Sequence, residues 1–142
     1  MTDVLPEVVP VDASLFASLD PPRLLGSRCG SCGTVVFPAA GSCPRCSQAA
    51  MAPHALAYRG TVWTWTVQGF APKAPYSPPA GGFTPFPVGY VDLGEVLVEG
   101  HLLVAREHLD IGTPVRLVLE PVVSAAGGEV VTYAFALDEE AL

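Results

Sequence analysis

Apolar and polar residues alternate in several short segments of the second half of the chain. In residues 61–68 two tryptophans, Trp63 and Trp65, fall on the same side of an extended strand, with threonine or valine between and around them. A period of two residues is typical of a strand with two different faces. Segments rich in Val, Leu and Tyr predict four further strands at residues 88–93, 96–104, 115–123 and 130–137.

The connections between these strands indicate how they are arranged. Gly94, residues 106–114 and the glycine-rich residues 124–128 separate the later strands, and residues 105–112 predict a helical turn. Five strands with an interruption after the third is the order of an OB-fold, a small Greek-key barrel. A five-stranded SH3-like barrel or a small sandwich would give much the same periodicity. We therefore predict a mainly β chain with an OB-fold barrel.

The region before residue 25 contains one candidate for a short helix. Asp12 or Ser14 can cap a helix over residues 15–19, and Pro21 and Pro22 follow where it would end. A helix of this length is unstable alone and has to dock on the rest of the chain or on another protein.

Composition limits the size and the setting of the protein. The 142 residues are half apolar, enough for one modest core with a small accessory, which we divide as residues 1–58 and an OB-fold domain at 59–142. Fifteen prolines and fourteen glycines favour short strands over long helices. The net charge of −7 repels phosphate backbones. The start of the chain lacks a basic and apolar signal, and no apolar run is long enough for a membrane span, so we expect a cytoplasmic protein.

The four cysteines form the most specific motif in the sequence. They make up two CxxC pairs, Cys29 with Cys32 and Cys43 with Cys46, separated by ten residues. In a reducing compartment this spacing favours a four-thiolate zinc site on a β-ribbon over disulfides. Such a site has no free position for an activated water, so we expect a structural role. An iron–sulfur centre, a redox pair, or a site that has lost its ion are the alternatives.

No arrangement of residues indicates an active site. His54, His101 and His108 are scattered without a shared motif, and the chain lacks a nucleophile elbow, a phosphate-binding loop and a dinucleotide fingerprint. Asp138, Glu139 and Glu140 near the end of the chain are expected to be solvated charges. We therefore predict no catalytic residues in this chain.

Aromatic residues provide the candidate contact sites. Trp63 and Trp65 could stack on single-stranded nucleic acid, but from residue 59 onward ten acidic residues face only four basic ones, which favours a core or protein-contact role. Residues 70–87 form a long proline-rich loop with Phe70, Tyr76, Phe83 and Phe86, which we interpret as a lid or interface. The residues predicted to face a ligand or partner are Trp65, Phe70, Phe83 and Phe86.

The ordered set of motifs resembles a known family. It consists of Cys29-Gly30-Ser31-Cys32-Gly33, Phe37-Pro38, Cys43-Pro44-Arg45-Cys46, the strand at residues 60–67, residues 86–93 and residues 109–115. In these motifs, which span roughly residues 12–137, the chain is similar to the domain-of-unknown-function 35 family. It departs from the family pattern after Pro38, where Ala39-Ala40-Gly41 replace a second proline and a basic residue.

The resemblance implies a fold and a function. It implies a rubredoxin-like zinc ribbon followed by an OB-fold, acting as a non-catalytic accessory subunit of a thiolase-like or lipid-transfer-type enzyme that condenses, cleaves or hydrates an acyl-CoA. The larger subunit would carry the catalytic residues, and a coenzyme A thioester would be shared between the two chains. The alternatives are a free-standing module that binds acyl-CoA or single-stranded nucleic acid, and an enzyme with His101 or His108 as its base.

Overall fold

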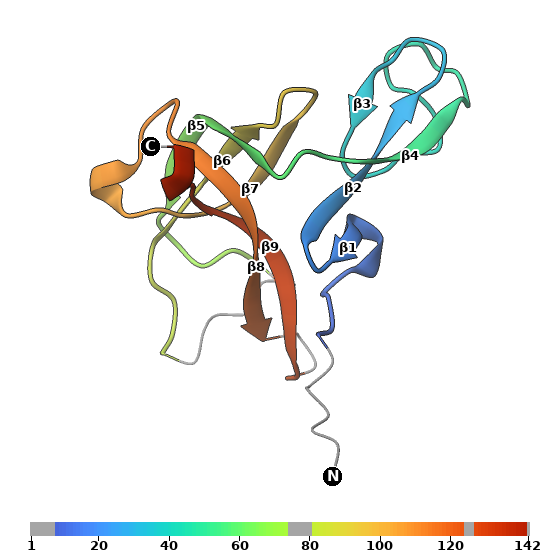
Figure 1. Ribbon diagram of the computed structural model, residues 1–142. Helices are drawn as coiled ribbons and strands as arrows, with labels where there is room; N and C mark the ends of the chain where they lie inside the picture. Colours follow the sequence, from blue (N-terminus) through green and yellow to red (C-terminus); the bar gives the residue numbers. More distant parts are fainter. Residues whose placement is uncertain (1–7, 74–80, 124–126, 142) are drawn as a thin grey trace.

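The computed structural model describes residues 8–73, 81–123 and 127–141 (Figure 1). Within these ranges the chain is mainly β, and its helical segments are single 3-10 turns. A small sheet carries the cysteines and lies beside a closed five-stranded barrel (Figure 1). Among the described residues, no helix has the length and apolar character needed to cross a lipid bilayer.

The barrel has the strand order of an OB-fold, as predicted. It closes in the order β5-β6-β7-β9-β8, and only the β7–β9 pair is parallel. A 3-10 turn, η2 (Arg106–His108), lies between the third and fourth barrel strands, where the sequence predicts a helical turn. The strands are β5 (Arg59–Gln68), β6 (Phe86–Asp92), β7 (Leu97–Leu103), β8 (Pro114–Val123) and β9 (Glu129–Leu137).

A β-bulge in β5 separates the environments of the two tryptophans. The β5–β6 register shifts between Val62 and Thr64, so Trp63 has no partner on β6, while Trp65 lies opposite Gly89. Trp63 is 54% exposed, whereas Trp65 packs against the core. The expectation that both side chains share one strand face is therefore wrong, because the extra residue of a bulge re-aims the side chains around it.

The N-terminal helix is shorter than predicted. Only η1 (Ala13–Leu15) is helical, as a 3-10 turn capped by the Asp12 carboxylate, which accepts from the Ser14 N–H at 3.0 Å. Residues predicted to continue the helix instead form β1 (Phe16–Leu19), which pairs with the start of β2 (Pro22–Cys29). Strand pairing gives the backbone groups of this short segment partners that a single helical turn cannot supply.

One hydrophobic core joins the two parts of the chain. Phe16, Leu24 and Leu56 from the N-terminal part belong to the same buried cluster as the inward-facing residues of the barrel. Around this core, the Phe37 ring meets the Tyr133 ring edge-on at 5.8 Å, and the Tyr133 hydroxyl donates to the Glu99 carbonyl at 2.7 Å. Burial raises the pKa of Tyr133 to about 12, so this hydroxyl keeps its proton and its hydrogen bond at neutral pH.

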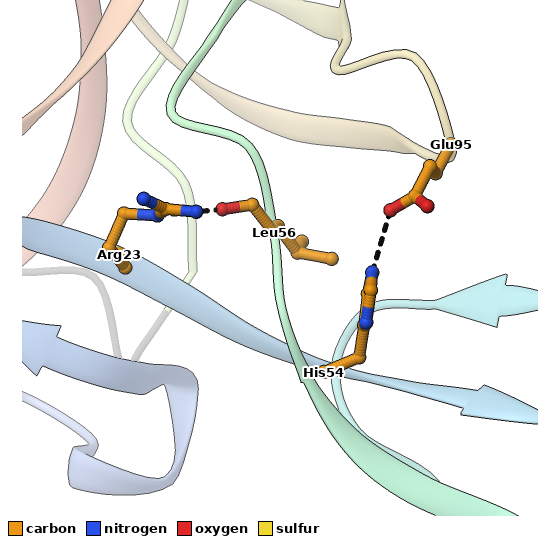
Figure 2. Close-up of polar contacts among 4 residues, drawn as sticks. All are labelled: Arg23, His54, Leu56 and Glu95. Carbon is orange, nitrogen blue, oxygen red and sulfur yellow. Dashed lines mark hydrogen bonds and ion pairs between the residues drawn. The ribbon is translucent and has the colours of Figure 1, made fainter.

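Two polar contacts near this core connect the cysteine-bearing sheet to the rest of the chain (Figure 2). The Arg23 Nε donates to the Leu56 carbonyl at 2.9 Å, which ties β2 to the segment that leads into β5. His54, on β4 (Met51–Ala55), contacts the Glu95 carboxylate in the β6–β7 turn at 2.7 Å. Both partners of the second contact are partly exposed, so it adds little stability, and we expect its main effect to be on orientation.

Gly89 provides a test of the barrel geometry. A Cβ at this position would lie 2.1 Å from the Thr64 carbonyl oxygen, too close for either backbone to tolerate without moving. We expect Gly89→Ala to lower the free energy of unfolding by about 2 kcal/mol or more, as other overpacked cores do, in a denaturant titration. Gly69→Ala is the control, because a Cβ at Gly69 meets nothing within 4 Å. Equal stability of the two variants would contradict the close approach of β5 and β6.

Candidate functional site

The two cysteine pairs lie in two turns with the same backbone pattern. In the first turn the Gly33 N–H donates to the Cys29 carbonyl at 2.8 Å, and in the second the Ser47 N–H donates to the Cys43 carbonyl at 2.9 Å. The backbone N–H groups of Cys29 and Cys43, the first cysteine of each pair, donate to the backbone carbonyls five residues later, those of Thr34 and Gln48. Each turn therefore aims two sulfurs toward one point.

Both turns need a residue in the left-handed backbone region. Gly33 has a φ of 79° and Ser47, at the equivalent place in the second turn, has a φ of 66°. Glycine adopts this region without steric cost, whereas a serine does so against its own preference. The second turn therefore keeps its shape only because other interactions around its cysteines hold it.

The four sulfurs are arranged as a tetrahedral metal site requires. All four Sγ atoms lie within 4.8 Å of one another, and the Cys29–Cys46 and Cys32–Cys43 pairs are each 3.6 Å apart. Tetrahedral zinc with Zn–S bonds of about 2.3 Å would place its sulfurs about 3.8 Å apart. Four soft thiolates at this separation fit zinc, and they leave no coordination position for water. When bound, the ion would supply folding energy to the ribbon.

Hydrogen bonds around the sulfurs already favour the thiolate form of two cysteines. The Thr34 hydroxyl lowers the pKa of the Cys32 thiol to about 6. The backbone N–H groups of Cys46 and Arg45 point at the Cys43 sulfur and lower its pKa. The pKa of Cys46 instead rises to about 11: the Gln48 backbone lowers it, but burial and the neighbouring cysteines outweigh that effect. The positive charge of a metal is what allows four adjacent thiols to ionise together.

A row of contacting side chains runs from Phe83 through β6 and β7 to β8. The Phe83 and Phe86 rings lie 5.9 Å apart, and Phe86 lies 4.9 Å from the His101 ring. His101 Nδ1 contacts the Glu120 carboxylate at 2.8 Å. A carboxylate on one ring nitrogen orients an imidazole and leaves the other nitrogen for a second partner. The sequence does not indicate that Glu120 contacts His101. Glu120 lies on β8, and in the barrel β9 lies between β8 and β7.

The other predicted contact residues have different surroundings. Trp65 packs against the core and lies under the Arg106 guanidinium, 5.2 Å from its ring centre. Phe70 is 75% exposed. Tyr76 lies outside the described residues. The structure thus brings Phe83 and Phe86 together and leaves Trp65 and Phe70 in separate settings.

The acidic residues near the end of the chain are not all solvated, contrary to the prediction. Asp138 is buried, with 2% of its surface exposed, and its carboxylate lies 3.3 Å from the Arg59 Nε. The Arg59 guanidinium also contacts Glu140 at 2.5 Å. The sequence shows three acidic residues in a row, but Arg59 lies far away in the chain, so this pairing follows only from barrel closure.

Replacing one cysteine tests the metal site. We expect Cys43→Ser to reduce bound zinc from about one atom to well below one per chain and to destabilise the ribbon, because one thiolate fewer opens a closed site. Metal analysis and thermal unfolding of protein purified without chelator measure both effects. Ser42→Ala, at the exposed neighbouring position, is the control and should retain its zinc. A wild-type protein that is folded and metal-free would contradict the assignment.

Comparisons with known proteins match both parts of the chain. A family model described as the ChsH2 rubredoxin-like zinc ribbon domain matches residues 16–52, and the model of the ChsH2 C-terminal OB-fold domain matches residues 53–120. A DUF35 domain-containing scaffold protein from Methanocaldococcus jannaschii is 30% identical over 115 residues, which cover 79% of this chain and 78% of that protein.

Two solved structures have a similar fold. A chain of the Ltp2-ChsH2(DUF35) aldolase superposes with a TM-score of 0.64 and 22% identity, over 87% of this chain and 91% of that one. A protein of unknown function from the DUF35 family of Sulfolobus solfataricus superposes with a TM-score of 0.51 and 15% identity, over 87% of this chain and 82% of that one. The ribbon, the barrel and the extent of the M. jannaschii match together show that this chain belongs to the DUF35 family.

Proposed function

We propose that this chain is a non-catalytic accessory subunit of a thiolase-like or lipid-transfer-type enzyme that acts on an acyl-CoA. One observation carries the proposal: the chain belongs to a family in which one relative is named a scaffold protein and a solved relative is part of an aldolase named for two components. That solved relative matches 87% of this chain, including both the ribbon and the barrel.

The two parts of the chain have separate roles in this proposal. Residues 1–58 form the N-terminal segment and the zinc ribbon, whose four thiolates hold a structural ion. Residues 59–142 form the OB-fold domain beside the acyl-CoA channel of the partner. The larger subunit supplies the catalytic groups, and the complex works in the cytoplasm.

The aromatic residues are the proposed contacts to ligand or partner. Phe83 and Phe86 already form a row of edge-on ring contacts with His101, which presents aromatic surface together with an oriented imidazole. Phe70 is exposed, and Trp65 is partly buried under Arg106. We propose that Trp65, Phe70, Phe83 and Phe86 border the channel and that a coenzyme A thioester is shared there between the subunits.

Co-expression with a thiolase-fold protein from the same genome tests the proposal. We expect the two to co-purify as a hetero-oligomer, and the partner alone to lose solubility or turnover, because an accessory subunit covers surface that its partner cannot expose. Size-exclusion chromatography and acyl-CoA turnover measure both effects. A partner that is soluble, monodisperse and fully active alone would remove the basis for the proposal.

Calorimetric titration of the isolated chain tests the alternative roles. We expect no heat of binding with oligonucleotides, because the acidic chain repels phosphates. Nucleic-acid binding that weakens steeply with salt, or tight binding of a coenzyme A thioester without the partner, would favour a free-standing binding module instead.

A further inference from the structure

A group of large apolar side chains lies exposed on the outside of the barrel. Its members come from three strands and a turn, and we call them the Trp63 patch. They are Trp63 (54% exposed), Tyr90 (41%), Leu97 (38%) and Ile111 (70%). Single exposed apolar residues are ordinary, but a group that includes a tryptophan and a tyrosine is typical of an interface centre.

The fold brings these four residues to neighbouring positions. The Trp63 and Tyr90 rings meet edge-on at 6.5 Å. Leu97 on β7 pairs with Asp92 on β6. Asp92 lies two residues beyond Tyr90 on the same strand. The turn that carries Ile111 is held beside β5, because the Gly112 N–H donates to the Val62 carbonyl at 2.7 Å and the Val62 N–H donates to Thr113.

Two features hold the aromatic members of the patch in place before any partner binds. The bulge in β5 turns Trp63 outward instead of toward the core, and bulges are a common means of re-aiming a side chain. Tyr90 lies directly opposite Glu99 on β7, whose carboxylate raises the pKa of the Tyr90 hydroxyl, and its ring packs edge-on against that of Trp63. Rings that are already ordered lose little entropy on binding.

The segments that build the patch are mainly acidic. Residues 61–68, 86–99 and 109–113 contain no lysine or arginine; of the flanking basic side chains, Arg59 is paired with Asp138 and Glu140, Arg106 lies over the Trp65 ring, and His54 contacts Glu95. The segments contain four carboxylates, Asp92, Glu95, Glu99 and Asp110. An apolar centre with an acidic rim fits a surface with an apolar centre and a basic rim, because charges around an interface favour the partner of opposite sign.

The same charge argues against two other occupants. A symmetric dimer of this chain through the patch would place the acidic rim against itself, which is unfavourable. A nucleic acid would bring phosphates to the same carboxylates, although the aromatic rings could stack on bases. The acidic rim of the patch therefore favours binding to a protein of different sequence.

We propose that the Trp63 patch is the docking face for the catalytic subunit, which meets it with an apolar socket surrounded by lysine and arginine. This proposal rests on the proposed function, and it adds which surface of the barrel carries the contact. Trp63 and Tyr90 provide the buried centre of the interface, and the four carboxylates select the partner and orient it.

Binding measurements with matched variants test the patch. The wild-type chain and its variants are titrated with the purified thiolase-fold partner at two salt concentrations. We expect Trp63→Ala to weaken binding roughly 30-fold or more, as a central aromatic anchor does. Ile111→Ser and Leu97→Ser should weaken it less. Asp110→Lys should weaken binding at low salt and reduce the dependence of affinity on salt.

The controls are residues of similar exposure elsewhere on the barrel. Leu103 lies on the same strand as Leu97 and is 40% exposed, so Leu103→Ser should bind within about twofold of wild type. Glu129→Lys, at the exposed start of β9, is the control for charge. Zinc content and circular dichroism show that each variant is folded.

The outcomes separate the two proposals. If the wild-type chain binds the partner and the Trp63, Leu97 and Ile111 variants bind equally well, the docking face is wrong and the subunit role remains. If the wild-type chain does not bind the partner at all, both proposals fail. If the chain alone forms a dimer in sedimentation experiments and Trp63→Ala dissolves it, the patch belongs to a second copy and the assignment is overturned.

Discussion

Phe16, Leu24 and Leu56 are buried in the same cluster as the inward-facing residues of the barrel, so the cysteine-bearing sheet and the barrel share one core. The other apolar side chains of the N-terminal part that pack against the core, Leu15, Leu19, Val35 and Phe37, are only partly buried, and β3 (Val35–Val36) is only two residues long. The stability of the sheet therefore has to come from the metal site and from the barrel. Losing either one would deprive the ribbon of an interaction that its own residues cannot replace.

This dependence explains how the backbone turns around the cysteines are tolerated. Ser47 holds a left-handed conformation that costs energy, and two N–H groups point at the Cys43 sulfur instead of at oxygen acceptors. Once four thiolates share one cation, the N–H groups and the cation together stabilise the negative sulfur, and the folding energy of metal binding offsets the cost of the Ser47 conformation. The ribbon backbone is therefore already arranged as it would be with zinc bound. Its packing against the barrel core fixes the position of the metal site.

The features that follow from local pattern could be predicted from the sequence, and those that depend on distant contacts could not. Alternating residues gave the five barrel strands, and CxxC spacing gave the metal ligands, since both signals lie within a few neighbouring positions. The segment at Phe16 was mistaken for helix because its pairing with β2 outweighs local preference. Asp138 was mistaken for a solvated charge because its partner, Arg59, lies at the opposite end of the barrel sequence.

The bulge at Trp63 is the departure from pattern with the greatest consequence. Strict alternation along β5 would send both tryptophans to the same side of the strand, and one extra residue sends Trp63 outward while Trp65 stays against the core. The half of the Trp63 side chain that stays exposed adds no stability to the isolated chain, because its apolar surface remains hydrated. The exposed ring is therefore a cost to the isolated chain that only a second surface can recover. The acidic residues around it disfavour a copy of the same chain, which is why we assign the surface that covers Trp63 to a different protein.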